Sequence, residues 1–450
     1  MPRNDIFPLT TLQHHSLQYW LQGLAENQPS SSNQSSLSLP FQRWFKFKEA
    51  FAPSLVIDCL RALNYRPTSC LDAFGGCGTT ALTAQFLGIK PTLFEVNPFI
   101  ADLAEAKLCA YDHLALETSF SEVRRNARSA RLDDPIKFLG EAPRTFCQTR
   151  NTRRWLFSRS TLARILAYRQ SIELLNDPPS KRLLKVLLGA CLVSLSNVVV
   201  NGKGRKYRSG WEHRQSNPED VDRLFGDAFR MAVSDTRVYS HRATTKYDIY
   251  RGSALSLINR IDPIDVAIFS PPYPNSFDYT DIYNIELWTL GYLRAKAEDR
   301  ALRVSTLRSH VQVELEQRGT APDSKALTTL VAKLKRARSK LWDPRIPEMV
   351  NGYFTDLSTL LDGLKAKLRP GGETFIIVGD SSYSGIVVNV GLILAETAAS
   401  HGYQVVSSTL LRRMRKSAQQ GGDFRLGEHV IRLRSPKRGF IPSCRSQVSS

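Results

Sequence analysis

The chain has 450 residues, 42% of them hydrophobic, so it can fold around a large core in one to three domains. Its formal net charge of +19 favours a polyanionic partner such as nucleic acid over an anionic membrane surface. The seven cysteines include no CxxC pair and no histidine cluster lies near them, so we expect no metal site, no disulfide framework and a cytoplasmic protein.

The N-terminal region is expected to be a short segment followed by a linker. Its first residues lack the apolar core of a signal peptide, and residues 27–40 are rich in serine and polar side chains. Residues 1–40 are therefore set apart from the rest.

The best candidate for a membrane span is residues 183–200, but Lys185 and several polar residues favour a buried core helix, and we expect no membrane partner.

The apolar pattern changes along the chain from sheet-forming to helical and back. After the linker it predicts a helix, then a strand, a glycine-rich turn, a helix, a strand and a further helix, which begin a βαβ unit. We expect an α/β fold in which one sheet domain is interrupted by two mainly helical insertions. The predicted segments are a first core segment (41–110), a helical basic insertion (111–246), a second core segment (247–292), a charged helical insertion (293–345), a third core segment (346–436) and a tail (437–450).

The glycine-rich turn lies in "LDAFGGCGTT", after a strand predicted over residues 71–74. Gly76 and Gly78 let the backbone turn tightly and approach a ligand, and Thr79 and Thr80 can cap the next helix. About twenty residues on, "TLFEVNP" ends a strand in Glu95, which could accept hydrogen bonds from a ribose diol. The spacing is not GxGxxG, which disfavours a dinucleotide. The turn and the acidic strand end predict a nucleoside-cofactor site, unless the glycines serve packing and Glu95 is a solvated carboxylate.

A second unusual stretch is "DVAIFSPPYPNSFDYTDIYNIELW", in which an apolar strand stops at Ser270, Pro271, Pro272 and Tyr273. Two prolines at the carboxyl end of a parallel strand make a rigid turn at the sheet edge where ligands bind. A hydroxyl, carbonyl oxygens and a flat ring can hold a planar heterocycle and accept hydrogens from its exocyclic amine. The alternative, a polyproline recognition segment, would need a polar context that is absent here.

These motifs resemble the S-adenosylmethionine-dependent DNA amino-methyltransferases that act on cytosine N4 or adenine N6. "DAFGGCGTT" is similar to the FxGxG cofactor motif, "FEVNP" to the acidic motif, "FKFKEAFAPSLV" to the segment that packs on the methionine end of the cofactor, and "YRGSAL" to the motif near its adenine ring. The resemblance covers residues 41–108 and 247–290, more weakly 354–380 and the last strands. The cofactor motif precedes the catalytic motif, unlike in many enzymes with Ser-Pro-Pro-Tyr.

The resemblance implies a Rossmann-like seven-stranded methyltransferase sheet, with S-adenosyl-L-methionine as the cofactor and no metal. The implied catalytic residues are Ser270, Pro271, Pro272 and Tyr273. The implied cofactor-binding residues are Phe51, Pro53, Asp72, Phe74, Gly76, Gly78, Thr79, Thr80, Glu95, Asn97 and Ser253.

The resemblance also implies a mechanism. The Ser270 hydroxyl and the Pro271 carbonyl accept the hydrogens of the target amine, and Tyr273 stacks on a base flipped out of a duplex. Ser-Pro-Pro-Tyr is the form usually associated with cytosine N4, whereas Asp-Pro-Pro-Tyr is commoner for adenine N6. Phe277, Tyr279 and Tyr283 either wall the pocket or belong to the core.

Contacts with double-stranded DNA are expected from the helical basic insertion, the candidate for target recognition. Its segment "NGKGRKYRSGWEHR" reads as a flexible basic loop with aromatic side chains, suited to phosphate contacts and a base wedge. The predicted DNA-binding residues are Lys203, Arg205, Lys206, Arg208 and Trp211.

The first hypothesis is thus a DNA cytosine-N4 methyltransferase, with a possible restriction or defence-system partner. Three others remain open: the same chemistry on adenine N6, an RNA amino-methyltransferase, and a non-catalytic DNA-binding protein on a methyltransferase fold. Intact Gly76, Gly78, Glu95 and the Ser-Pro-Pro-Tyr turn argue against the last.

Overall fold

The computed structural model describes residues 9–23, 37–201, 204–213, 215–274, 278–312, 319–413 and 426–436. The chain divides into two compact units: unit 1 takes in Met1–Asp58, Gly75–Gly252 and Phe277–Thr306, and unit 2 takes in Cys59–Phe74, Ser253–Ser276 and Leu307–Ser450. Seven strands belong to the main sheet, β10-β11-β7-β6-β1 in unit 2 and β2-β5 in unit 1. The predicted α/β fold with a seven-stranded sheet is therefore confirmed.

Unit 2 contains the parallel strands β1 (Ser69–Asp72), β6 (Ile264–Phe269) and β7 (Leu368–Gly379), with β11 (Gly427–Arg434) antiparallel to β7 and β10 (Gln404–Arg413) antiparallel to β11. All six residues of β6 are buried, as an apolar strand in a parallel sheet requires. Leu71 lies opposite Ala267, and Phe269 opposite Ile376. This register brings the carboxyl ends of β1, β6 and β7 to one edge of the sheet.

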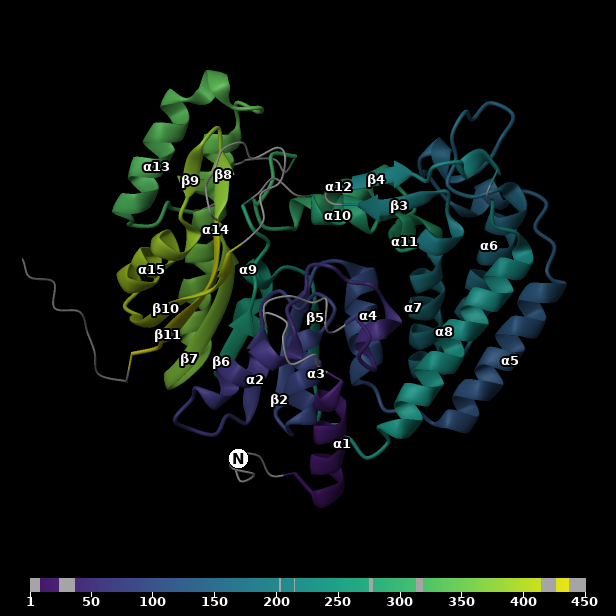
Figure 1. The fold of residues 1–450 in the computed structure, drawn as a ribbon, viewed down its shortest axis with the longest axis horizontal. Coiled ribbons are helices and arrows are strands. Elements are labelled where there is room, and N and C mark those ends of the chain that lie inside the picture. Colours follow the sequence, from purple (N-terminus) through teal and green to yellow (C-terminus); the bar gives the residue numbers. More distant parts are fainter. Residues whose placement is uncertain are drawn as a thin grey trace, which may run out of the picture. The chain divides into compact units, whose positions relative to one another are not determined.

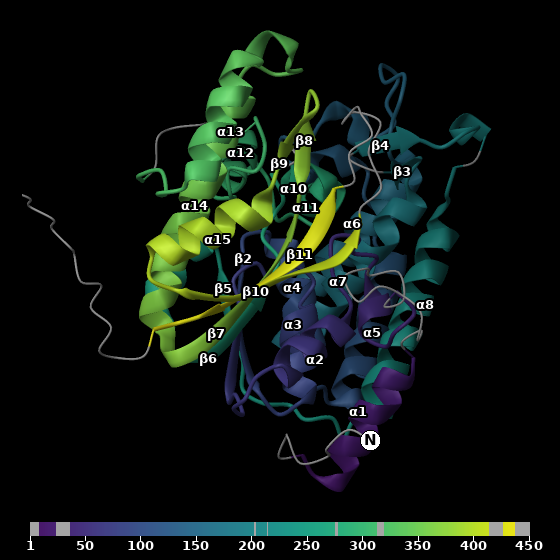
Figure 2. The same cartoon turned by 60° about the vertical axis from the view of Figure 1, so that its left-hand side comes forward.

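The other elements of unit 2 are α9 (Ala254–Leu257), η6 (Ile258–Arg260), α13 (Lys325–Arg336), η7 (Arg338–Lys340), α14 (Ile346–Lys367), α15 (Val390–Ser400) and the hairpin of β8 (Ser381–Tyr383) and β9 (Ile386–Val388). α15 packs on β7, β10 and β11, and α14 packs on α13 and α15 (Figure 2). α2 (Pro53–Arg61) begins in unit 1 and ends in unit 2. The predicted tail, residues 437–450, lies outside the described residues.

Unit 1 holds the parallel strands β2 (Lys90–Glu95) and β5 (Asp248–Arg251), in which Glu95 lies opposite Arg251. α3 (Thr79–Phe86) and α4 (Pro98–Leu108) pack on β2. The N-terminal helix α1 (Thr11–Gln22) also packs on this unit, because Trp20 stacks on Phe86 with a centroid distance of 4.5 Å. The short turn η2 (Gln42–Trp44) follows the linker.

The predicted helical insertion contains four long helices that lie side by side, α5 (His113–Ser129), α6 (Arg159–Glu173), α7 (Pro178–Leu195) and α8 (Pro218–Val238) (Figure 1). Stacked Phe120 and Phe229, 3.8 Å apart, join α5 to α8. α7 ends before β3 (Val198–Asn201), which pairs with β4 (Gly204–Tyr207). The 3-10 turns are η3 (Pro135–Phe138), η4 (Arg144–Phe146) and η5 (Trp211–His213). Within the described ranges, no helix is both long enough and apolar enough to cross a bilayer.

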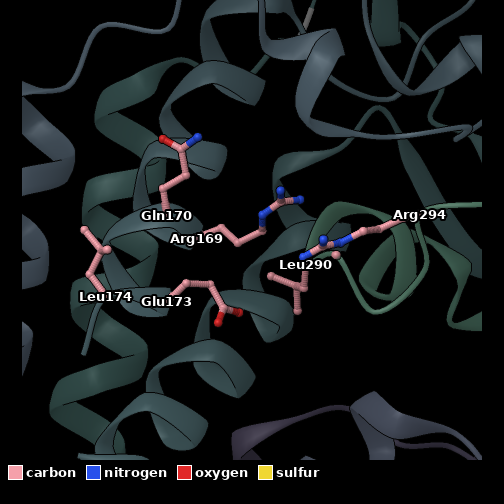
Figure 3. A pocket seen from close by; sticks show the side chains of 7 residues that line it. Arg169, Gln170, Glu173, Leu174, Leu290 and Arg294 are labelled. Carbon is pink, nitrogen blue, oxygen red and sulfur yellow. The ribbon is translucent and has the colours of Figure 1, made fainter. Parts of the chain in front are cut away.

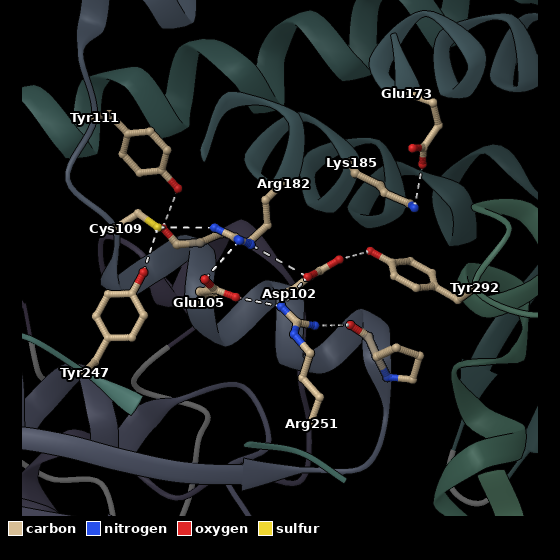
Figure 4. A network of polar contacts seen from close by, with 12 residues as sticks. Asp102, Glu105, Cys109, Tyr111, Glu173, Arg182, Lys185, Tyr247, Arg251 and Tyr292 are labelled. Atoms are coloured by element: carbon tan, nitrogen blue, oxygen red, sulfur yellow. Dashed lines mark hydrogen bonds and ion pairs between the residues drawn. The ribbon is translucent and has the colours of Figure 1, made fainter. Parts of the chain in front are cut away.

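After the Ser-Pro-Pro-Tyr stretch, unit 1 continues with α10 (Tyr279–Ile282), α11 (Asn284–Thr289) and α12 (Lys296–Val304). A polar network ties the end of β5 to the helices (Figure 4). Arg251 donates to Asp102 at 2.7 Å and to Glu105 at 2.6 Å, and Arg182 of α7 pairs with Glu105 at 2.9 Å. These contacts hold β5, α4 and α7 together beside the acidic end of β2.

Candidate active site

The glycine-rich turn joins the end of β1 to α3, and glycine is required in it for two reasons. Gly76 and Gly78 have positive φ angles of 49° and 79°, a backbone conformation that L-residues rarely adopt. A Cβ at Gly78 would also lie 3.0 Å from the Cβ of Ala104 on α4. Packing against α4 thus contributes to the glycine requirement, alongside the close approach to a ligand that the sequence suggests.

The predicted capping role of Thr79 and Thr80 is wrong. Gly78 is the N-cap of α3 in the left-handed conformation, with no side-chain cap, and the two threonines are the first helical residues. Both are buried, and the Thr79 hydroxyl lies 3.4 Å from the thiol of Cys77. The left-handed glycine lets the chain enter the helix directly, so the threonine side chains are left for packing.

Glu95 ends β2 beside the glycine-rich turn, as predicted. The backbone N–H of Gly76 donates to its Oε2 at 2.8 Å, and the N–H of Asn97 donates to its Oε1 at 2.8 Å. Asn97 in turn caps α4, because its Oδ1 accepts from the N–H groups of Phe99 and Ile100. The carboxylate is therefore held in one orientation by main-chain donors from both sides.

A buried lysine beneath the turn was missed by the sequence interpretation. The ammonium group of Lys107 donates to the Cys77 carbonyl at 2.8 Å and to the Gln42 Oε1 at 3.0 Å, and burial lowers its pKa. Lys107 has no exposed surface. The signal was available, because a lysine interrupts an otherwise apolar face of the helix over residues 98–108.

Two buried amide groups next to the turn have spare donors. Within the described residues, neither the Gln42 Nε2 nor the Asn97 Nδ2 has a hydrogen-bond partner. A buried donor without an acceptor is costly, so such groups are candidates for contacts with a bound molecule. The turn, Glu95 and these amides fit a polar cofactor that carries hydroxyl and carboxylate groups.

In unit 2, the Ser-Pro-Pro-Tyr turn follows directly from β6, beside the end of β1. Pro271 is buried, whereas Ser270, Pro272 and Tyr273 are half-buried. Asp72 ends β1 and is buried, and it accepts a 3.0 Å hydrogen bond from the N–H of Phe74. The Phe74 ring lies 5.8 Å from that of Phe269. Asp72 and Phe74 thus lie next to the end of β6, from which the Ser-Pro-Pro-Tyr turn begins.

Two contacts fix the Ser-Pro-Pro-Tyr turn in place. The hydroxyl of Tyr273 donates to the Oε1 of buried Glu428 at 2.7 Å, and the hydroxyl of buried Tyr383 donates to the Pro274 carbonyl at 2.7 Å. Neither Glu428 nor Tyr383 belongs to a motif that the sequence interpretation recognised. Both come from strands beyond the turn, so their proximity depends on the fold.

The segment similar to the methionine-end motif is largely buried. Phe51 is 8% exposed, and Pro53 is buried as the first residue of α2. Ser253 precedes α9 and is half-buried. That Phe51, Pro53 and Ser253 contact the cofactor stays a prediction.

Of the aromatic residues after the Ser-Pro-Pro-Tyr turn, Tyr283 belongs to the core. It is 6% exposed, stacks on Phe47 with a centroid distance of 5.5 Å, and donates to the Oε2 of Glu49 at 2.6 Å. Burial raises the pKa of Glu49. Phe277 lies outside the described residues, as does the side chain of Tyr279.

The basic segment forms a β-hairpin, β3–β4, rather than the flexible loop that its composition suggests. Lys206 is exposed, and Arg205 contacts the Asn284 Oδ1 and, at 3.4 Å, Asp281. Lys203 lies outside the described residues. The hairpin therefore contacts the segment that follows the Ser-Pro-Pro-Tyr turn.

Arg208 and Trp211 have contacts within the fold. The Arg208 guanidinium donates to the carbonyls of Ser196 and Val193 at 3.1 and 2.9 Å, at the end of α7. Trp211 is 6% exposed and lies edge-on to Trp155. That these two residues contact DNA stays a prediction, and it would require them to leave these partners.

A pocket in unit 1 of about 410 Å³ contains none of the predicted site residues (Figure 3). It is lined by Arg169, Gln170, Glu173, Leu174, Leu290, Gly291 and Arg294. Burial and the neighbouring Arg294 lower the pKa of Arg169.

Among the residues with described positions, no group of three or more histidine, cysteine or acidic side chains is placed to hold a metal ion.

The fold and the site define a class, an α/β protein in which a glycine-rich turn meets an acidic strand end and a Ser-Pro-Pro-Tyr turn ends a buried parallel strand. No protein-family model matches the chain. The chain is 25% identical over 431 residues to the Type II methyltransferases M.AvaI from Nostoc sp. and from Anabaena variabilis, covering 87% of this chain and 85% of each relative.

It is also 23% identical over 452 residues to the Type II methyltransferase M.BsoBI from Geobacillus stearothermophilus, covering 88% of this chain and 86% of that protein. Among solved structures, TehB from Haemophilus influenzae aligns with 85% of this chain and 62% of its own at 8% identity. Its TM-score of 0.29 is too low to support an argument.

Proposed function

We propose that this protein is a site-specific DNA methyltransferase of a restriction-modification system. The similarity to three Type II methyltransferases over most of the chain supports this class. S-adenosyl-L-methionine is the methyl donor, and we assign the exocyclic N4 amine of a flipped cytosine as the acceptor. The substrate is double-stranded DNA in the cytoplasm, and the expected partner is a restriction enzyme for the same site.

The observation that carries the proposal is the place of the Ser-Pro-Pro-Tyr turn in the sheet. It ends a fully buried parallel strand, β6, whose neighbour β1 leads directly into the glycine-rich turn. Ligands of open α/β sheets bind outside the carboxyl ends of the strands. A polyproline recognition segment would not need this position.

The catalytic residues act by positioning and by accepting hydrogen bonds. The amine lone pair of cytosine is delocalised into the ring, which makes the amine a poor nucleophile. The Ser270 hydroxyl and the Pro271 carbonyl accept its two hydrogens, which favours a localised lone pair. The amine nitrogen would take the methyl group as the bond between that carbon and the sulfonium sulfur of the donor breaks, which would leave a neutral thioether, and the amine would release one proton to water. Tyr273 stacks on the flipped base and offsets part of the cost of extruding it.

The cofactor residues lie on both sides of the glycine-rich turn. The cofactor supplies an electrophilic methyl group. Glu95, held by the N–H groups of Gly76 and Asn97, accepts hydrogen bonds from the ribose hydroxyls. The spare amide donors of Gln42 and Asn97 suit the carboxylate of the methionine end.

Nucleoside mass spectrometry of DNA from cells that express the chain tests the proposal, with Tyr273→Ala as the control. N4-methylcytosine in the parent sample and its absence from the control is the expected result. N6-methyladenine alone would overturn the assignment of cytosine and keep the enzyme class. Label in RNA but in no DNA would move the protein to the RNA methyltransferases. Cofactor binding without transfer to any nucleic acid would favour a non-catalytic DNA-binding protein.

A further inference from the structure

The proposed base-stacking ring, Tyr273, is tied to a buried acidic residue far along the chain. Its hydroxyl donates to the Oε1 of Glu428 at 2.7 Å. Glu428 lies in β11, where it pairs with Gly379 of β7 on one side and Arg412 of β10 on the other. Glu428 is 4% exposed, so bulk water cannot replace the tyrosine hydroxyl as the hydrogen-bond donor to its carboxylate.

A basic residue holds the carboxylate in turn. The Arg412 Nε donates to the Glu428 Oε2 at 2.7 Å, and its Nη2 donates to the Oε1 at 3.5 Å. The arginine of the neighbouring strand thus holds both oxygens, and the Oε1 also accepts from the tyrosine. Hydrogen bonds to an ionised acceptor are roughly twice as strong as neutral ones. These hydrogen bonds link Arg412 of β10 to Glu428 of β11, and Glu428 to Tyr273 of the turn.

The backbone beside Tyr273 is held as well. Pro271 and Pro272 restrict the φ angles before it, and the Tyr383 hydroxyl donates to the Pro274 carbonyl after it. With the backbone fixed on both sides, the remaining freedom of Tyr273 is rotation of its side chain. The bond to Glu428 fixes the hydroxyl at the far end of the ring and so limits the directions in which the side chain can point.

We propose that Glu428 is a positioning residue that sets the Tyr273 ring in the orientation required to stack on the flipped base. The inference rests on the proposed function, because it needs a base to be stacked. A ring that is already oriented loses little conformational freedom when the base arrives. Glu428 does not touch the substrate, and its effect on transfer passes through Tyr273.

The first measurement is independent of methylation. Tyr273→Phe removes the hydroxyl and keeps the ring, and Glu428→Gln keeps the shape of the acceptor and removes its charge. Their double variant completes a double-mutant cycle measured by urea unfolding. The two changes should be non-additive, because Tyr273→Phe removes the bond that Glu428→Gln weakens. Additive effects in folded variants would mean that the contact does not form in solution, which overturns the inference.

The second measurement is methyl transfer to duplex DNA. Tyr273→Phe and Glu428→Gln should each lower kcat by about tenfold, and the double variant should be no worse than either. Affinity for S-adenosylmethionine should be unchanged, since the cofactor motifs are intact. The matched control is Glu348→Gln, an exposed acid paired with Arg338, which should leave kcat unaltered.

The third measurement reports on stacking itself. The probe is a duplex with 2-aminopurine at the target position. In the parent, the oriented ring should quench the fluorescence of the 2-aminopurine, and that fluorescence should be stronger with Glu428→Gln. Unchanged kcat and quenching, with an active parent, would overturn the positioning role and leave the proposed function standing. A parent that methylates no DNA would refute the proposed function, and the inference with it.

Discussion

Glu95→Gln gives a direct test of the cofactor site. The two carboxylate oxygens accept N–H bonds from Gly76 and Asn97 at 2.8 Å each. Glutamine has one oxygen, so one of the two N–H groups would face an NH2 group and lose its acceptor. Leaving a donor unsatisfied costs about 1–3 kcal/mol, equivalent to about 5- to 150-fold in affinity if the cofactor requires the ordered turn.

Calorimetric titration with S-adenosylmethionine measures the effect, and circular dichroism confirms that the variant is folded. The control is Glu122→Gln, an exposed acid on α5, for which we expect the affinity of the parent. An affinity within twofold of the parent in folded Glu95→Gln would refute the reasoning, because it would separate Glu95 from the cofactor site.

Three further predictions rest on the contacts of single residues. Gly78→Ala should destabilise the protein by about 1–3 kcal/mol in urea unfolding, because φ is 79° and the new Cβ would meet Ala104 at 3.0 Å; equal stability would contradict it. Lys206→Ala should reduce the slope of DNA affinity against salt by roughly 0.9 in a log–log plot, and an identical slope would show that the hairpin does not contact phosphate. Burial raises the pKa of Glu286 to about 7, so stability should fall as pH rises from about 4.5 to 7, and Glu286→Gln should flatten that fall; parallel pH profiles would contradict it.

The strands were predictable because their local pattern is strong. The apolar run that forms β6 ends at prolines, and the run that forms β1 ends at glycines, so composition alone marks both boundaries. Chain order and the right-handed crossover rule then limit how such strands can be arranged. The first strand was expected over residues 71–74 and lies at Ser69–Asp72, an error of two residues, because Ala73 and Phe74 already belong to the turn.

The predictions failed where one residue type can satisfy two physical roles. Threonine is a good N-cap, but at the start of α3 a left-handed glycine occupies the N-cap position without a side-chain cap, and the threonines are buried in the first turn of the helix. A run of basic residues reads as a flexible loop, yet the valine run of residues 198–200 followed by Asn-Gly also suits a hairpin, and pairing of β3 with β4 decides between them. At these positions, local propensity has a smaller effect on the structure than the contacts made with the rest of the chain.

Residues that orient a site are harder to predict than residues that contact its ligand. The Ser-Pro-Pro-Tyr turn is recognisable because the chemistry of an amine demands those groups in consecutive positions. Glu428 is 155 residues from Tyr273 in sequence, and nothing about a glutamate in a strand signals a tyrosine partner. The register of β11 with β7, which places Glu428 opposite Gly379 at the carboxyl end of β7, brings it to the sheet edge where the turn begins. A buried carboxylate there requires donors, and Arg412 and Tyr273 supply them. The same desolvation that makes the acid costly to bury makes its bond to the tyrosine strong, so the fold gains an orienting contact at the place where the proposed reaction needs one.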